Sequence, residues 1–363
     1  MQLIRGVMMG RKEKVERSRF AENGIGNDLK ITREARGYAQ KEICDGICSL
    51  ATFSRIETGG RVVDFLMIEA FLGRMKIEPS EYEFVLDDAD YFAYRQRERI
   101  GNLVGKGEEA QAEEELAAYG ERYGTEGLHG QFLDFQRGLL AQTGSRPDRE
   151  KSKSLFLKAL EATAPSHREK FRQREILSNL ELRCMAEIIS CTQNSVEREK
   201  EYDELYAYFA WGCRREWGVP APYRIAMQYY AECLYENGKY EKSILICDEA
   251  LEELYGTSKL ENRGEIFLVR AKAREARAEA MELKAAAEGA NSGAEETEDE
   301  KAQAGERNRR GRMEQKERRQ CLRDFLTAYT IFSFYEGEDN KEAKKIRQHL
   351  EEKYQWPFID WEI

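Results

Sequence analysis

The chain has 363 residues, of which 58 are Lys or Arg and 68 are Asp or Glu, so its formal net charge is −10. Taken whole, this acidic balance argues against nucleic acid as a partner. No segment approaches the run of about 18 apolar residues that spans a membrane, and the first residues are too short and too interrupted for a secretory signal. We therefore expect a cytoplasmic protein of two or three domains with no membrane partner. Only six prolines occur, which predicts an all-α chain.

The first quarter of the chain divides into a basic arm and a compact head. Residues 1–25 are basic and lack apolar periodicity, so we predict a flexible arm, part of which could precede a start at Met8 or Met9. Residues 26–86 predict five short helices, at about 27–36, 40–45, 49–57, 64–74 and from 80 onward. Ser49 and Asp64 are the expected N-caps, and Gly37 and Gly46 the expected turns. The predicted core consists of Ile43, Ile47, Phe53, Ile56, Ile68 and Leu72.

The second and third predicted helices flank a tight glycine turn, which is the arrangement of a helix-turn-helix motif. Local charge agrees with this interpretation. Residues 1–61 contain 12 Lys or Arg and 8 Asp or Glu, a balance of +4, which leaves −14 on the rest of the chain. A basic head on an acidic body is the asymmetry expected of a protein whose head alone approaches DNA.

The string AQKEICDGICSLATFSRIETG resembles the XRE/Cro type of helix-turn-helix, and most closely that of the Rgg/PlcR-type regulators, the peptide-sensing RRNPP group linked to quorum sensing. The resemblance implies that Gln40 meets a DNA phosphate and that the start of the third helix reads bases. Leu50 departs from the pattern, because relatives often carry a polar residue there. The DNA-binding residues so predicted are Arg33, Gln40, Ser49, Leu50, Ala51, Thr52, Arg55 and Arg61. The alternative is a small helical subdomain with no DNA role.

Residues 90–363 show apolar residues at helical period almost throughout. The clearest unit, 226–254, resembles a tetratricopeptide repeat, and weaker units pair 132–142 with 152–163 and 321–335 with 341–354. Long helices near 167–193 and 198–217 and the stretch 263–283 fill the array. Five or six helix pairs would stack into a right-handed α-solenoid.

Two segments depart from this repeat pattern. Residues 284–319 lack an apolar stripe, and we predict a flexible or partly helical insertion within a late repeat. Its RNRRGR cluster is either a solvated charge run or a further DNA contact. The apolar tail from Gln355 to Trp361 is expected to fold back on the last repeat or to contribute to a dimer.

In the family that the sequence resembles, the inner surface of the repeat array binds a short signalling oligopeptide. Amide and guanidinium side chains can bond the backbone of an extended peptide, while aromatic residues hold its side chains. The peptide-binding residues predicted on this basis are Gln136, Asn179, Arg183, Arg224, Gln228 and Tyr229. Relatives often have Asn where this chain has Tyr229. For each residue, ordinary packing between repeats is the alternative.

No pattern of an enzyme or of a metal site is found. None of the eight cysteines forms a C-x-x-C pair, and the three histidines are scattered, so we expect no cofactor, no metal and no catalytic residues. Cys48 is expected to pack in the head core, with a cross-link between two copies as the alternative. The sequence therefore predicts a homodimeric transcription regulator that joins through its repeats, binds a double-stranded DNA operator and is controlled by a peptide. The competing interpretation is a protein-interaction scaffold whose head does not bind DNA.

Overall fold

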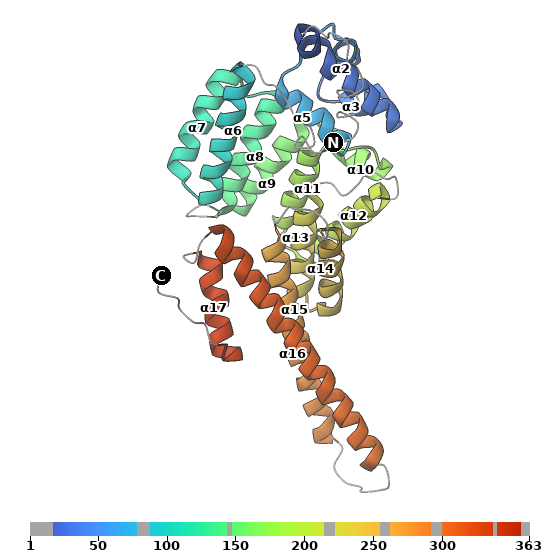
Figure 1. Ribbon diagram of the computed structural model, residues 1–363, viewed down its shortest axis with the longest axis vertical. Helices are drawn as coiled ribbons and strands as arrows, with labels where there is room; N and C mark the ends of the chain where they lie inside the picture. The colour runs from blue at the N-terminus through green and yellow to red at the C-terminus, as the bar shows by residue number, and fades with distance from the viewer. Residues whose placement is uncertain are drawn as a thin grey trace. The chain divides into compact units, whose positions relative to one another are not determined.

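The computed structural model describes residues 17–77, 88–143, 147–213, 222–254, 262–291, 300–336 and 340–356. Every regular element in these ranges is an α-helix, which confirms the predicted all-α class (Figure 1). The chain forms two compact units. The first holds residues 1–194 and 201–223, and the second holds residues 195–200 and 224–363. The predicted head thus shares one unit with the first repeat helices. No helix in the described ranges is long and apolar enough to cross a membrane.

The head is built from α2 (Arg17–Ala35), α3 (Gln40–Cys44), α4 (Leu50–Glu57) and α5 (Phe65–Arg74). Helix α2 begins ten residues before the predicted 27, so the expected arm is helical from Arg17 onward. The predicted caps are confirmed: Ser49 and Asp64 accept hydrogen bonds from the backbone N–H groups of Thr52 and Met67. Residues 1–16 and the fifth predicted helix, at 80–86, lie outside the described residues.

The predicted head core is confirmed. Ile43, Phe53, Ile56, Ile68 and Leu72 are buried together, and Ile47 packs against them half-buried. Phe53 and Phe71 meet edge to face, with ring centroids 4.8 Å apart. The thiol of Cys48 also packs against this core, and burial raises its pKa to about 11. Cys48 is therefore a protonated thiol at neutral pH, as expected of a packing residue.

The repeat helices of the first unit are α6 (Asp88–Lys106), α7 (Glu109–Tyr123), α8 (Gly127–Thr143), α9 (Arg149–Glu161), α10 (His167–Gln173), α11 (Asn179–Ser190) and α12 (Ser195–Cys213). Successive helices pair, α6 with α7 and α8 with α9, and α11 packs on α9. The predicted single helix over 167–193 is wrong. Arg174 is left-handed (φ 55°) and ends α10, while Ser178 and Glu181 form a capping box that starts α11.

The second unit contains α13 (Pro222–Glu236), α14 (Tyr240–Leu254), α15 (Arg263–Asn291), α16 (Glu300–Glu336) and α17 (Lys341–Tyr354). The clearest predicted repeat is the pair α13 and α14, joined by the bond from Ser243 Oγ to the carbonyl of Ala231 (2.8 Å). The guanidinium of Arg270 clamps α15 to α16 through two bonds to Asp324, at 2.9 and 2.7 Å. The described part of this unit is a succession of helices, as the repeat pattern predicts.

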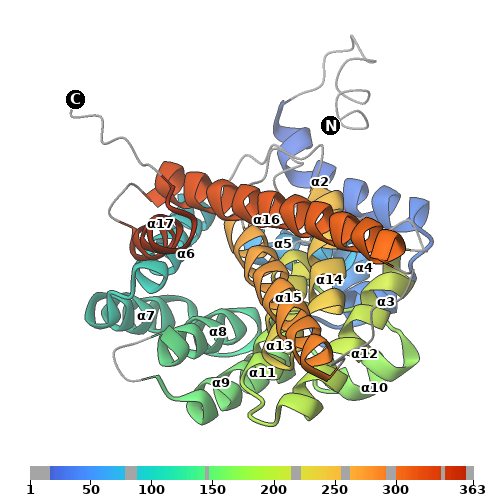
Figure 2. The same ribbon diagram turned by 90° about the horizontal axis from the view of Figure 1, so that it is seen from below.

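The predicted insertion is helical in its described parts, because it continues α15 to Asn291 and begins α16 at Glu300. Figure 1 shows these two helices lying side by side and extending beyond α14, and in Figure 2, seen from below, both lie nearer the viewer than α14. The side chains of the RNRRGR cluster lie outside the described residues. Of the apolar tail, Gln355 and Trp356 are described, and the Trp356 N–H bonds the carbonyl of Leu350 on α17 (3.1 Å).

Candidate nucleic-acid interface and repeat-helix residues

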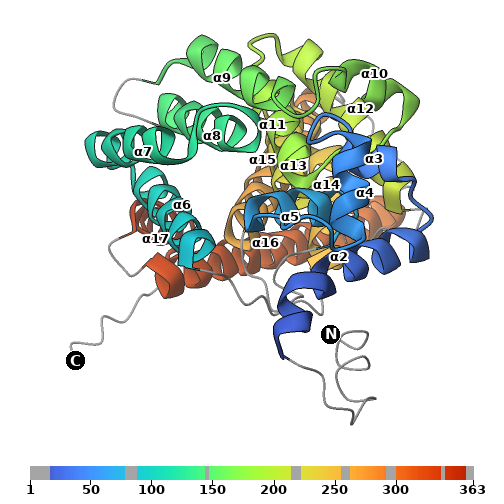
Figure 3. The ribbon, with the colours of Figure 1, turned by 90° about the horizontal axis from the view of Figure 1, so that it is seen from above.

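The start of α4 is held in one conformation by local chemistry. Gly46 adopts φ +78°, which lets the chain turn tightly after α3. Ser49 then accepts the backbone N–H of Thr52 (3.1 Å) and donates its hydroxyl to Thr52 Oγ1 (2.9 Å). Figure 3 shows α3, α4 and α5 grouped together, with α10 beside α3. The motif is thus a rigid helix-turn-helix.

One surface at the start of α4 carries most of the residues predicted to read DNA. Ser49, Leu50, Ala51 and Arg55 are exposed, and Thr52 is half-buried. Arg61 is also exposed and bonds Thr52 Oγ1 at 3.4 Å, so its guanidinium lies beside the start of the helix. The side chains offered here are one leucine and one alanine, two hydroxyls and two guanidinium groups. These are the chemical types that contact thymine methyl groups, base edges and phosphates.

Sequence reasoning missed one residue of this surface. Val62 follows Arg61 in the loop before α5 and is 81% exposed, more than any other large hydrophobic side chain in the described ranges. The signal was readable, because Val62 lies outside the helical apolar pattern and next to a predicted DNA contact. Leu50 is 51% exposed, so the surface presents two large aliphatic side chains.

The prediction that Arg33 contacts DNA is corrected by its burial. Arg33 is only 8% exposed, and its Nε and Nη2 meet the carboxylate of Glu57 at 2.5 and 3.1 Å. A further bond from Nη1 reaches the carbonyl of Tyr38 (2.7 Å). The hydrogen bond with Glu57 raises the pKa of Arg33, so its guanidinium keeps its charge. Arg33 therefore holds α2 to the end of α4.

Gln40 shares this network, because its Nε2 donates to Glu57 Oε2 (2.6 Å). Its side chain is half-buried, at the first residue of α3. Glu57 thus ties the start of α3 to α2, and the amide of Gln40 is fixed in direction. A phosphate contact by Gln40 stays a prediction.

Three predicted peptide-binding residues lie on α8 and α11. Gln136 on α8 and Asn179 on α11 each have a buried side-chain oxygen without a hydrogen-bond partner among the described residues. The guanidinium of Arg183 on α11 lies 5.9 Å from the ring of Phe135, the neighbour of Gln136. Arg183 is not free, since it pairs with the buried Glu187 at 2.6 Å. The structure therefore brings Arg183 close to α8.

The other three predicted residues lie on α13 in the second unit. Gln228 is 8% exposed and accepts a bond from Asn262 (3.0 Å) while donating to Glu232 (3.1 Å). Arg224 is equally buried, and Tyr229 is half-buried. Arg224 and Gln228 are therefore buried, and peptide binding by either residue stays a prediction. Packing within the repeat, the alternative considered for each residue, describes Gln228 better.

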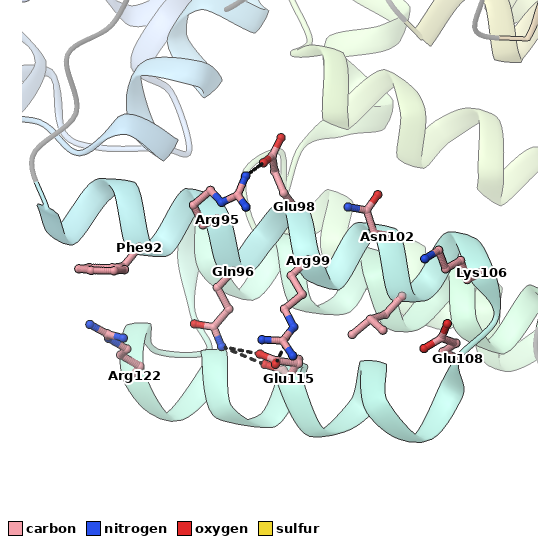
Figure 4. Close-up of a pocket in the computed structure, with 11 residues that line it drawn as sticks. Phe92, Arg95, Gln96, Glu98, Arg99, Asn102, Lys106, Glu108, Glu115 and Arg122 are labelled. Carbon is pink, nitrogen blue, oxygen red and sulfur yellow. Dashed lines mark hydrogen bonds and ion pairs between the residues drawn. The ribbon is translucent and has the colours of Figure 1, made fainter. Parts of the chain in front are cut away.

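A cavity of about 670 Å³ lies elsewhere in the first unit, between α6 and α7. Figure 4 shows guanidinium and carboxylate groups alternating along it. Arg95 pairs with Glu98 (3.4 Å) and Arg99 with Glu115 (3.2 Å), so these opposite charges largely neutralise each other. None of the predicted ligand residues lines this cavity. Its internally paired charges do not define a ligand.

A buried ion pair joins α5 of the head to α11 of the repeats. Arg74, the last residue of α5, and Glu181 are both fully buried, with Nη2 2.7 Å from Oε1. Burial opposes the ionisation of Glu181, but the charge of Arg74 and hydrogen bonds from Arg74, Ser178 and Thr163 outweigh it and lower its pKa. Nearby, the Lys76 ammonium donates to the carbonyl of Leu177. Sequence reasoning missed the pair of Arg74 and Glu181, because these two residues are 107 positions apart in the chain.

The buried ammonium of Lys76 is expected to make the free energy of unfolding depend on pH. Burial lowers its pKa to about 7, whereas in an unfolded chain the pKa of a lysine is about 10.4. Between these values the unfolded state binds more protons, so this group makes the free energy of unfolding rise with pH. We expect a rise of about 2 kcal/mol from pH 7 to 9 that is absent in Lys76→Met. Urea titrations at both pH values measure it, and equal slopes for the two proteins would contradict the prediction.

Comparison with known proteins adds little to these observations. No family model matches the chain, and no curated protein matches it. A search of solved structures finds the crystal structure of Bacillus thuringiensis PlcR in complex with the peptide PapR7 and DNA. That structure is 15% identical, with a TM-score of 0.48, and the match covers 92% of this chain and 100% of the other. A likeness this slight assigns no family, and the function must be argued from the residues themselves.

Proposed function

We propose that this chain is a sequence-specific DNA-binding transcription regulator of the Rgg/PlcR type. The observation that carries the proposal is the exposed surface at the start of α4, where Leu50 and Arg55 stand on a capped helix and Arg61, from the following loop, reaches Thr52. Such a helix can enter the major groove with its first turn leading. Residues 26–86 would form the DNA-binding domain, and residues 90–363 the repeat domain with its insertion at 284–319. The regulator would work in the cytoplasm as a homodimer, which suits an operator with two half-sites.

Selection from a pool of random DNA duplexes tests the DNA-binding half of the proposal. The full-length chain is expected to enrich one sequence and to bind it with steep salt dependence. The double variant Arg55→Ala with Arg61→Ala should weaken binding by roughly 30-fold or more, because each of the two lost contacts costs about 1–3 kcal/mol. Both side chains are exposed, so the fold should persist.

The matched control is Arg95→Ala, which removes an exposed arginine on α6 of the same unit. It should leave the Kd within about twofold, since a charge that touches no DNA changes only weak long-range electrostatics. Equal losses in the control and the double variant would contradict the assignment of the reading surface. Failure to enrich any duplex would favour the alternative of a protein-interaction scaffold.

We further propose that the repeat domain binds a short peptide through α8 and α11. Support comes from Gln136 and Asn179, whose buried amide oxygens have no described partner and could accept backbone N–H groups of an extended ligand. Calorimetric titration with fractions of the oligopeptides that the host secretes would identify a ligand. Gln136→Leu and Asn179→Leu, which keep similar volume, should each weaken its binding. A tight ligand unaffected by both changes would place the peptide elsewhere.

A further inference from the structure

The turn of the helix-turn-helix motif is held from the repeat side by one guanidinium group. Arg74 Nη1 donates to the carbonyls of Ile43 (2.9 Å) and Asp45 (2.6 Å), at the end of α3. Its Nη2 donates to the carbonyl of Thr163 (3.2 Å) and to Glu181 (2.7 Å), in the repeats. The side chain is fully buried, so no water replaces these bonds. Removing any one acceptor therefore changes how the others are held.

Two further contacts press the same turn against the repeats, and a third ties α5 to α6. Lys170 on α10 pairs with Asp45 at 2.6 Å. Gly46 lies against the carbonyl of Thr163 so closely that a Cβ atom at this residue would come within 1.9 Å of that oxygen. On the other side of α5, Arg97 of α6 pairs with Glu69 at 3.1 Å. The head is thus packed onto the repeats on two sides of α5.

The acceptors on the repeat side connect to the helices that carry the predicted peptide residues. Glu181 lies on α11, between Asn179 and Arg183. Its Oε1 also accepts the hydroxyl of Thr163 (2.8 Å), which in turn accepts Nε2 of Gln131 (2.7 Å). Gln131 lies on α8, as does Gln136. A continuous buried chain of hydrogen bonds therefore runs from the turn before α4 to α8 and α11.

We propose that Arg74 and Glu181 form the joint through which the repeats set the position of the DNA-reading helix. Arg74 is a positioning residue, since it contacts the turn before α4 and not the reading surface. A ligand that shifts α11 relative to α5 would change the acceptors of Arg74, and with them the turn before α4. Such a ligand acts by binding one arrangement of the joint better than the other. This inference rests on the proposed function and names the route of its regulation.

Hydrogen exchange on the full-length chain, with neither DNA nor peptide, tests the joint. Glu181→Gln keeps the shape of the side chain and removes its charge, and it lies in the repeats, far from the head in sequence. We expect amides of residues 40–57 to exchange at least about tenfold faster, while amides of α6 and α7 keep their rates. The control is Asp134→Asn, which neutralises a buried carboxylate on α8 paired with Lys158 at 3.0 Å. It should leave residues 40–57 unchanged.

Affinity for the selected duplex supplies a second readout. Glu181→Gln should change the Kd by about fivefold or more, and Asp134→Asn by less than about twofold. If Glu181→Gln does not fold, Thr163→Val removes only the hydroxyl that bridges Gln131 and Glu181, and it should produce a smaller change in the same segment. The proposed joint is overturned if folded Glu181→Gln leaves the exchange of residues 40–57 unchanged. It is also overturned if Asp134→Asn changes that exchange equally. Because exchange requires no DNA, a chain that binds no duplex would refute the proposed function and still report on the joint.

Discussion

Replacing Arg74 by methionine is expected to lower the free energy of unfolding of the first compact unit by about 3–5 kcal/mol. Methionine fills most of the space but leaves the carboxylate of Glu181 buried without its charge partner. It also leaves the carbonyls of Ile43 and Asp45 without the bonds that Arg74 supplies. Stranding one charge of a buried pair costs far more than the intact pair contributes, which makes this the largest loss that we expect from a single substitution.

Urea unfolding followed by circular dichroism measures this loss, with one transition fitted for each compact unit. The control is Arg95→Met, because Arg95 pairs with Glu98 on the surface of α6 with its side chain 62% exposed. That variant should cost no more than about 1 kcal/mol. If Arg74→Met and Arg95→Met lower the urea midpoint equally, the ion pair of Arg74 and Glu181 does not stabilise the unit as a buried pair would.

The same comparison of buried and exposed charges explains which parts of the candidate site could be predicted from the sequence. The caps at Ser49 and Asp64, the turn at Gly46 and the apolar core all follow from local spacing along the chain. Arg33 and Arg74 look like surface charges by the same reasoning. Their roles depend on Glu57 and Glu181, which lie 24 and 107 residues further along. Periodicity shows which face a residue occupies and not which partner meets that face.

The break between α10 and α11 shows a different kind of error. No glycine or proline interrupts 167–193, so apolar periodicity alone predicts one helix. The start of α11 was nevertheless readable. Ser178 is followed three residues later by Glu181, which is the capping-box spacing. Glu181 therefore does two things at once, because one oxygen caps α11 and the other binds Arg74. The end of α10 at Arg174 had no comparable signal.

Gly46→Ala is expected to destabilise the first unit by about 1–3 kcal/mol more than Gly37→Ala. The two glycines share a left-handed backbone, with φ of +78° and +72°, so alanine is strained to a similar degree at both. They differ in surroundings. A Cβ at Gly37 meets nothing within 4 Å, whereas a Cβ at Gly46 would come within 1.9 Å of the carbonyl oxygen of Thr163. Backbone cannot yield as a flexible side chain does, so the head and the repeats must separate or the turn must deform.

The pair of variants therefore isolates the contact between head and repeats from the conformational strain of the turn. Urea titration gives the difference in free energy of unfolding, and exchange of residues 40–57 shows where it acts. Gly37→Ala should change exchange only near the end of α2, since the space around Gly37 is open. Gly46→Ala should speed exchange across α3 and α4, the same segment in which Glu181→Gln is expected to act from the other side of the joint. Equal destabilisation by the two alanines would mean that the turn carries the strain alone and that the repeats do not hold it.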